Sequence, residues 1–238
     1  MKSQLSKDRD MLFIFKRKMQ MKKINFQSFF MIFFIGAAII TTAAKGNNLP
    51  DTIPKGWRAG LNNAPDIVIG TDTLVKHSGK ASGFMQRSLS LKLLPGSANL
   101  LQSIAAEPYR NKRVRLSVYL KTNEIEFTSG RGPFLYFRVD GQDSILTFAN
   151  TVRNLIVETT DWTMYHITLD VPETSVNLDF GVVLMCQGTI WIDDYNLEVV
   201  DQSIPSDDWV APNKMKGAVT KKNYQPNAIA MNLGFEDR

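Results

Sequence analysis

Alternation of hydrophobic and polar residues is the dominant pattern between residues 57 and 200. The clearest case is residues 112–120, where every second residue from Val114 to Leu120 is aliphatic and the residues between them are polar, charged or aromatic. Because successive side chains of a strand point to opposite faces, this pattern predicts a strand with one buried face. Helical periodicity is almost absent, although a helix is not excluded around residues 150–157.

Similar short runs recur through the same region and predict about eight or nine strands. Turns are expected at residues 77–80 (HSGK) and 140–143 (DGQD). The number and spacing of the runs favour an all-β fold, an antiparallel jelly-roll β-sandwich. The predicted strands are residues 67–69, 83–86, 100–104, 112–120, 133–140, 144–148, 165–169, 178–184 and 188–200.

Composition divides the 238 residues into four parts. Residues 1–44 read as a signal peptide or N-terminal anchor, and residues 45–54 as a polar linker that contains proline. Residues 55–200 form the predicted β-sandwich module. Residues 201–238 begin as a linker rich in Asp, Pro, Lys and Asn and end in a partly apolar tail.

Charge is unevenly distributed along the chain. The formal net charge is +5, but residues 1–44 alone hold eight Lys or Arg and two Asp, and the rest is close to neutral. A nucleic-acid-binding protein needs its basic excess on the folded domain. Nucleic acid is therefore not expected as a partner.

The leader has the three parts of a secretory signal. Lys22 and Lys23 precede an apolar run of 12 residues at 29–40, and small residues follow at 42–44. A membrane span needs about 20 apolar residues, so the run is short for one. We expect cleavage and a periplasmic or secreted protein. An uncleaved N-terminal anchor is the alternative, and it would be the chain's contact with the membrane.

The chain contains one cysteine, Cys186, within a predicted strand. A single cysteine excludes an internal disulfide and a zinc site built from several cysteines. We expect a small apolar side chain packed in the sheet.

Five short segments occur in a fixed order between residues 54 and 194. Together they resemble galactose-binding-like jelly rolls, the fold of many carbohydrate-binding modules beside exported bacterial hydrolases and in some regulators. The resemblance covers about residues 57–200 and implies a non-catalytic binding module. The segments are residues 54–57 (PKGW), 77–82 (HSGKAS), 109–115 (YRNKRVR), 159–162 (TTDW) and 191–194 (WIDD).

The chain departs from that pattern at its opening. Such modules usually begin with a strand of the form Asn-x-Gly-Phe-Glu, whereas residues 47–51 lack the Phe and the Glu. The motif stands instead at residues 232–236, as NLGFE. Either the tail folds back to supply that strand, or it starts a further module. The second alternative is preferred, and it would make the chain a piece of a multidomain protein.

The resemblance also implies a structural calcium ion. Calcium takes six to eight oxygen ligands. Asp193 or Asp194 would supply one, with backbone carbonyls near residues 77–80 and a Glu from the opening strand, which is missing unless Glu236 returns. As neighbours on a strand, the two aspartates should point to opposite faces. The alternative is that one is solvated and the other binds backbone groups of a loop.

Polar and aromatic side chains on the non-core face of two predicted strands are the candidate ligand-binding residues. Aromatic rings stack on the apolar face of a sugar, and polar groups bind its hydroxyls. We expect these residues to share a concave surface, whereas the tryptophans at 57, 162 and 191 are expected to pack in the core or at its edge. The candidates are Tyr119, Tyr136, Arg138, Asp140 and Arg115.

Catalysis finds little support. The chain has two histidines, His77 and His166, and no nucleophile elbow, HExxH motif or phosphate loop. The sequence therefore predicts a non-catalytic, exported carbohydrate-binding module. The alternative is a protein-interaction or spacer domain from a hydrolase or regulator, without sugar binding.

Overall fold

The computed structural model describes residues 53–88, 96–126, 132–152, 156, 158–208 and 225–237. The chain separates into two units, Met1–Lys45 and Gly46–Arg238, and every described residue belongs to the second. The predicted leader and all of the first linker but its last two residues lie outside the described residues. In these ranges, no helix is long and apolar enough to cross a membrane.

Strands make up nearly all regular structure in the described residues, together with one 3₁₀ turn at Glu107–Tyr109. The strands are β1 (Arg58–Asn62), β2 (Ile67–Asp72), β3 (Ser82–Arg87), β4 (Ser97–Ala105), β5 (Lys112–Glu126), β6 (Phe134–Asp140), β7 (Ile145–Asn150), β8 (Glu158–Val171), β9 (Asn177–Leu184) and β10 (Gln187–Val200).

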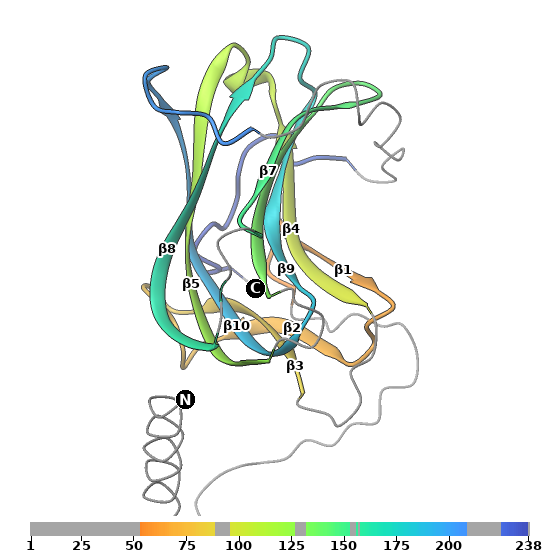
Figure 1. Cartoon of the computed structure of the whole chain (residues 1–238), viewed down its shortest axis with the longest axis vertical. Helices are drawn as coiled ribbons and strands as arrows, with labels where there is room; N and C mark the ends of the chain where they lie inside the picture. Colours follow the sequence, from red (N-terminus) through yellow and green to blue (C-terminus); the bar gives the residue numbers. More distant parts are fainter. Residues whose placement is uncertain are drawn as a thin grey trace, which may run out of the picture. The chain divides into compact units, whose positions relative to one another are not determined.

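The strands form two five-stranded sheets that pack face to face (Figure 1). One sheet has the order β1-β4-β9-β6-β7 and the other β2-β3-β10-β5-β8, and all strand pairs within them are antiparallel. The predicted antiparallel jelly-roll β-sandwich is confirmed.

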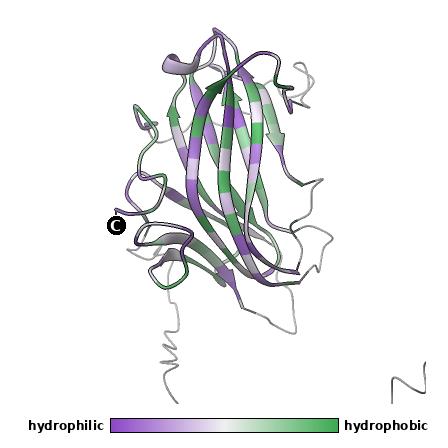
Figure 2. Ribbon diagram, turned by 90° about the vertical axis from the view of Figure 1, so that its left-hand side faces the viewer, coloured by the Kyte–Doolittle hydropathy of each residue, from purple (hydrophilic) through white to green (hydrophobic). Residues whose placement is uncertain are grey.

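The alternation seen in the sequence places the core between the two sheets. Val114, Leu116, Val118 and Leu120 of β5 are fully buried, and hydrophobic and hydrophilic bands alternate along the strands (Figure 2). Cys186 is also buried, and burial raises the pKa of its thiol to about 11. The thiol stays protonated at neutral pH, as expected of a packing residue.

Several strands extend beyond the predicted bounds, and the largest differences are at β1 and β8. β1 was not predicted, and β8 begins seven residues before the predicted 165–169 strand. Both are edge strands, and an edge strand carries polar residues that weaken the hydrophobic pattern. β7 ends at Asn150, and the N–H of Thr151 donates to the carbonyl of Leu135 on β6 at 3.0 Å. The described residues around position 150 therefore still pair with β6 and do not start a helix.

The C-terminal segment, residues 225–237, folds back into the domain. Phe235 is fully buried, and its ring stacks on Trp57 with 4.8 Å between the centroids. The Trp57 indole N–H donates to the carbonyl of Asn232 at 2.9 Å. The NLGFE motif therefore completes the core between the sheets, and the preferred alternative, that these residues start a further module, is wrong.

The same segment also extends a sheet edge beyond the end of β1. The Asn227 N–H donates to Ser103 O at 2.8 Å, and the Ala105 N–H donates to Asn227 O at 2.9 Å. The side chain of Gln102 binds the backbone of Met231 in both directions, at 2.8 Å each. These bonds satisfy edge groups of β4 that would otherwise lack partners.

Candidate functional site

The five predicted ligand-binding residues lie on two different sheets. Arg115 and Tyr119 are on β5, whereas Tyr136, Arg138 and Asp140 are on β6. They therefore lie on opposite outer faces of the sandwich, and the expectation of one shared surface is wrong. Alternation shows which side chains turn away from the core, but it does not show which sheet a strand joins.

We call the outer face of the β1-β4-β9-β6-β7 sheet the Tyr136 face. By strand register, Ser103 of β4 lies next to Asp179 of β9, which lies next to Arg138 of β6. The Arg138 Nη2 donates to Asp140 Oδ2 at 3.0 Å and to Asp179 Oδ2 at 2.5 Å. Its Nε lies 2.9 Å from Asp140 Oδ1 in an ion pair. One guanidinium therefore holds two carboxylates.

The two carboxylates are buried and the guanidinium is half-buried. Burial alone would lower the pKa of Arg138, but the charges of Asp140 and Asp179 outweigh it and the pKa is raised. Arg138 is therefore a permanent cation, and its position on the face is fixed by charge-assisted hydrogen bonds.

The polar atoms of this face that have no hydrogen-bond partner within the described part of the chain include the hydroxyl oxygen of Ser103 and the side-chain oxygen of Asn99, and both are buried. Ser103 as a whole is 2% exposed. A buried polar atom without a partner is costly, on the order of 1–3 kcal/mol, so native proteins rarely leave one unless it serves another purpose.

The next row of the Tyr136 face passes through Leu101, Gly181 and Tyr136. A side chain at Gly181 would place its Cβ 2.3 Å from the carbonyl of Leu100, so only glycine allows β4 to approach β9 this closely. As a consequence, no side chain stands between Leu101 and the half-buried ring of Tyr136.

The outer face of the β2-β3-β10-β5-β8 sheet, which we call the Tyr119 face, has its polar groups bound to one another. Arg115 pairs with Glu198 at 2.7 Å. The ring of His77 stacks on Tyr119 with 3.8 Å between centroids and covers one face of it. The indole N–H of Trp191 donates to Asp72 at 2.9 Å.

Asp193 and Asp194 both bind the turn at residues 77–80. Asp193 Oδ2 accepts the N–H groups of His77 and Ser78 at 2.8 and 3.2 Å. Asp194 accepts from the Ser78 hydroxyl at 2.8 Å and contacts the His77 Nδ1 at 2.6 Å. The expectation that they point to opposite faces is wrong, because β10 has an irregular register here and Asp194 adopts φ 49°.

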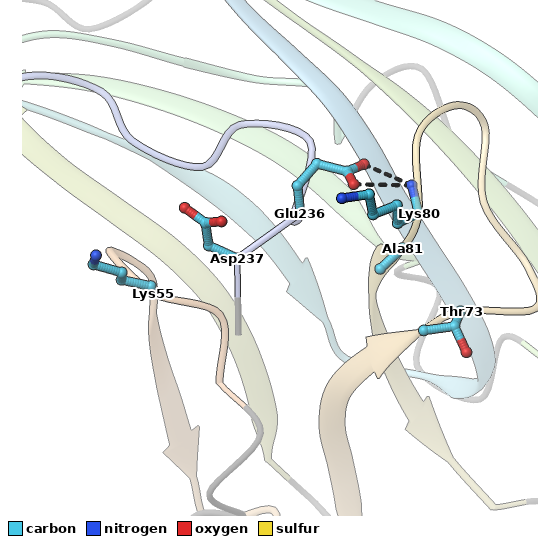
Figure 3. Close-up of a pocket in the computed structure, with 6 residues that line it drawn as sticks. All are labelled: Lys55, Thr73, Lys80, Ala81, Glu236 and Asp237. Carbon is cyan, nitrogen blue, oxygen red and sulfur yellow. Dashed lines mark hydrogen bonds between the residues drawn. The ribbon is translucent and has the colours of Figure 1, made fainter.

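A third carboxylate reaches the same turn from the C-terminal segment. The Lys80 N–H donates to both oxygens of Glu236, at 2.9 Å each (Figure 3). Gly79 has φ +58°, a conformation that favours glycine, and a Cβ there would lie 1.8 Å from Glu236 Oε1, so a larger residue would push this carboxylate out of its contact with the turn. We call Asp193, Asp194 and Glu236 the carboxylate clamp.

Within the carboxylate clamp, burial raises the pKa of Asp193, and the charge of Asp194 adds to this, whereas the N–H groups of His77, Ser78 and Asp194 oppose it. The clamp resembles no catalytic relay, because the Ser78 hydroxyl donates to Asp194 and not to His77. Its geometry is that of a structural tie.

The clamp is also the predicted calcium site. The Glu whose absence counted against that site is present at the turn, as Glu236. Among the described residues, however, no group of three or more His, Cys, Asp or Glu side chains could hold a metal ion. An ion here would need backbone carbonyls of the turn as further ligands, as the resemblance implies.

A cleft of about 500 Å³ lies beside the clamp (Figure 3). Two lysines and two acidic residues line the cleft, so their charges compensate one another. Within the described part of the chain, none of the lining residues is aromatic. It was not predicted from the sequence, although the HSGK and NLGFE motifs contribute to it. The lining residues are Lys55, Thr73, Lys80, Ala81, Glu236 and Asp237.

No protein-family model matches the chain. The uncharacterized HTH-type transcriptional regulator YbfP of Bacillus subtilis (strain 168) is 34% identical over 175 residues, which are 73% of this chain and 58% of the regulator. The chain thus spans less than two thirds of that relative's length.

Solved structures with a similar course of the chain are more distant in sequence. The enzymatically active domain of tailspike protein 4 of bacteriophage CBA120 is 14% identical, with a TM-score of 0.47, over 61% of this chain and 20% of the tailspike chain. A family 16 carbohydrate-binding module is 14% identical, with a TM-score of 0.42, over 63% of this chain and 99% of the module. A family 61 module in complex with β-1,4-galactotriose is 14% identical, with a TM-score of 0.39, over 65% of this chain and all of that module.

Proposed function

We propose that this protein is a carbohydrate-binding module without catalytic activity and that it binds its ligand on the Tyr136 face. The observation that carries the proposal is the pair of buried, unsatisfied oxygens of Ser103 and Asn99 on a face that also presents Tyr136 and Arg138. The ring of Tyr136 would contact the apolar side of a pyranose, and sugar hydroxyls would bind these oxygens once the side chains that cover them move aside.

Isothermal titration against a panel of oligosaccharides tests this proposal. For a glycan that binds, Tyr136→Ala should weaken the affinity roughly tenfold, because an aromatic contact contributes on the order of 1 kcal/mol or more. Tyr119→Ala is the matched control, since it removes the same side chain from the opposite sheet and should leave the affinity unchanged. An equal loss in both variants would show that the Tyr136 face is not the site.

A second candidate function is supported by the similarity to a transcriptional regulator. In this alternative the module is an interaction or spacer domain of a longer protein and has no sugar affinity. It predicts that no glycan in the panel binds and that a protein partner copurifies with the domain. The buried oxygens on the Tyr136 face favour the first candidate, because a spacer has no use for them.

We also propose that the carboxylate clamp binds calcium as a structural ion, through Asp193, Glu236 and turn carbonyls. Saturating calcium should then raise the melting temperature relative to EDTA, because an ion that binds only the folded state at 100 times its Kd stabilises it by about 2.7 kcal/mol. Glu236→Gln should abolish this response and Asp161→Asn, an exposed acid elsewhere, should retain it. Equal melting temperatures in calcium and EDTA would contradict the proposal.

Export to the periplasm or the medium, with cleavage of residues 1–44, remains a proposal supported by the tripartite leader alone. Cell fractionation followed by N-terminal sequencing of the mature protein tests it. A protein that retains residue 1 in the membrane fraction would support the uncleaved anchor instead.

A further inference from the structure

The outer edge of β4, beside the Tyr136 face, is covered by two separate parts of the chain. β1 pairs with β4 from Ser97 to Leu101. Beyond that point the C-terminal segment takes over, and the backbone of Asn227 pairs with Ser103 and Ala105. The two parts meet between Leu101 and Ser103, so the order of this edge depends on a segment that is distant in the sequence.

Gln102 stands at this junction, and its side chain is fully buried. Its neighbours Leu101 and Ser103 lie on the Tyr136 face, so the side chain of Gln102 points inward. There its amide group donates to the carbonyl of Met231 and accepts from the N–H of Met231, at 2.8 Å each. A buried amide is costly to leave unpaired, so these bonds hold the C-terminal segment against β4.

The C-terminal segment also holds the start of β1. The side-chain amide of Asn227 donates to the carbonyl of Gly56 at 2.9 Å. The indole N–H of Trp57 donates to the carbonyl of Asn232 at 2.9 Å. The next residue, Arg58, begins β1, so the segment fixes the position from which Arg58 projects.

Arg58 belongs to the row of the Tyr136 face that passes through Leu101, Gly181 and Tyr136. Neighbouring strands lie about 4.8 Å apart, so this row measures roughly 14 Å from β1 to β6. Because Gly181 contributes no side chain, a ligand on Tyr136 can extend across it to Leu101 and Arg58, which are both partly exposed. The end of the row away from Tyr136 is therefore the edge that the C-terminal segment holds.

We propose that the C-terminal segment positions one edge of the ligand site, and that Gln102 is the positioning residue through which it acts. This inference rests on the proposed function. Neither Gln102 nor Met231 contacts the ligand. They keep β1 and β4 where Arg58 and Leu101 meet a glycan that is seated on Tyr136. Because a coupling between two sites is reciprocal, a bound glycan should in turn hold the segment more firmly.

Isothermal titration of the intact protein against β-1,4-linked oligosaccharides of galactose, xylose and glucose is the first test. For an oligosaccharide that binds, Gln102→Met should weaken the affinity at least about fivefold, although the ligand face keeps all of its side chains. Methionine keeps the unbranched shape and removes both hydrogen bonds to Met231. Gln187→Met is the matched control. Gln187 is a buried glutamine of the opposite sheet, and its replacement should change the affinity less than about twofold.

Hydrogen exchange of the unaltered protein gives a second readout, which a purely structural role of Gln102 would not change. The N–H groups of Asn227 and Met231 both donate to groups of β4. With saturating oligosaccharide, their exchange should slow at least about fivefold. The N–H of Ser203, in an exposed turn after β10, should exchange at the same rate with and without the ligand.

The outcomes separate this inference from the proposed function. Equal losses of affinity in Gln102→Met and Gln187→Met, or no loss in either, would overturn the positioning role, whereas Tyr136→Ala still decides the proposed function. Unchanged exchange of Asn227 and Met231 with oligosaccharide bound would overturn the positioning role as well. If no glycan binds the intact protein, the proposed function fails, and the positioning role fails with it.

A second variant covers the case in which melting curves show that Gln102→Met does not fold. Asn227→Ala removes only the side-chain bond to the carbonyl of Gly56 and leaves the backbone pairing with β4 in place. It should weaken the affinity at least roughly twofold, because a hydrogen bond contributes a modest net free energy. An affinity equal to that of the unaltered protein would contradict the inference.

Discussion

The Tyr119 and Tyr136 faces carry the same kinds of residue, yet they differ in how those residues are satisfied. On the Tyr119 face, Arg115 is paired with Glu198 and the ring of Tyr119 is covered by His77. On the Tyr136 face, the side-chain oxygens of Ser103 and Asn99 have no partner in the described part of the chain. Arginine and tyrosine on a sheet surface thus do not by themselves indicate a binding site. Polar groups left without a partner are the more informative sign.

The difference also assigns a structural role to the Tyr119 face. Its turn at residues 77–80 is tied to β10 by Asp193 and Asp194 and to the C-terminal segment by Glu236. These three contacts join parts of the chain that are far apart in sequence. The Tyr119 face therefore closes the fold, and the proposed ligand site lies on the Tyr136 face.

The largest expected effect comes from removing the side chain that anchors the C-terminal segment in the core, because this segment gives the Tyr119 face its structural role. Phe235→Ala should lower the free energy of unfolding by about 3–5 kcal/mol, because a fully buried aromatic ring leaves a cavity. Ile229→Ala in the same segment is the control. Ile229 is 65% exposed, and its loss should change stability by less than about 0.5 kcal/mol.

Urea denaturation of the two variants measures the difference. Similar midpoints for Phe235→Ala and Ile229→Ala would mean that the segment does not contribute to the core. The same would follow if deletion of residues 225–238 left the urea midpoint unchanged. Either result would contradict the conclusion that the C-terminal segment, through Glu236, helps to hold the turn at residues 77–80.

Two serines sharpen the comparison between the faces. Ser82 is fully buried, and its hydroxyl donates to Val75 O at 2.6 Å beside the turn on the Tyr119 face, so Ser82→Ala should cost about 1 kcal/mol. Ser103 is equally buried but its hydroxyl oxygen has no partner, so Ser103→Ala should be neutral or stabilising. In contrast, Ser103→Ala should weaken glycan binding several-fold.

Chemical denaturation and titration of the same two proteins give both readouts. A cost of about 1 kcal/mol for Ser103→Ala would show that its hydroxyl has a structural partner. The Tyr136 face would then resemble the Tyr119 face. Unchanged glycan affinity in Ser103→Ala would remove this serine from the proposed site.

Much of the fold was predictable from local pattern, and less of the site was. Alternation located the strand at residues 112–120 and the core-facing side chains of β6 and β9. Both can be predicted because the pattern of buried and exposed positions is set by successive residues of a single strand. Which sheet a strand joins depends on long-range pairing, so the separation of Tyr119 from Tyr136 was not visible. Asp179 and Ser103 were missed for the same reason, since only the register of three strands brings them beside Arg138.

The carboxylate clamp shows a second limit of sequence reasoning. The Asp193-Asp194 pair and the NLGFE motif were both recognised, but the simple rule of opposite faces failed at an irregular strand with a positive φ. The return of residues 232–236 depends on the fit of Phe235 against Trp57, and no local pattern encodes that fit. Recognising the residues was therefore easier than placing them.

The smallest expected effect concerns pH and a hydrogen bond on the Tyr119 face. Burial alone would raise the pKa of Asp72, but the indole N–H of Trp191, the N–H groups of Leu74 and Val75, and the charge of Lys76 outweigh it, so the pKa is lowered. A carboxyl with a lowered pKa stabilises the fold above its unfolded value of 3.8, and this contribution is lost as pH falls through the folded pKa. Asp72→Asn should therefore cost less than about 1 kcal/mol at pH 6, since the group is largely solvated, and should cost less at pH 2.5 than at pH 6. Urea midpoints at the two pH values, with Asp143→Asn in the exposed turn between β6 and β7 as control, measure the effect. If the cost of Asp72→Asn were the same at both pH values, the contact with Trp191 would not depend on the charge of Asp72, and this part of the Tyr119 face would be held by packing alone.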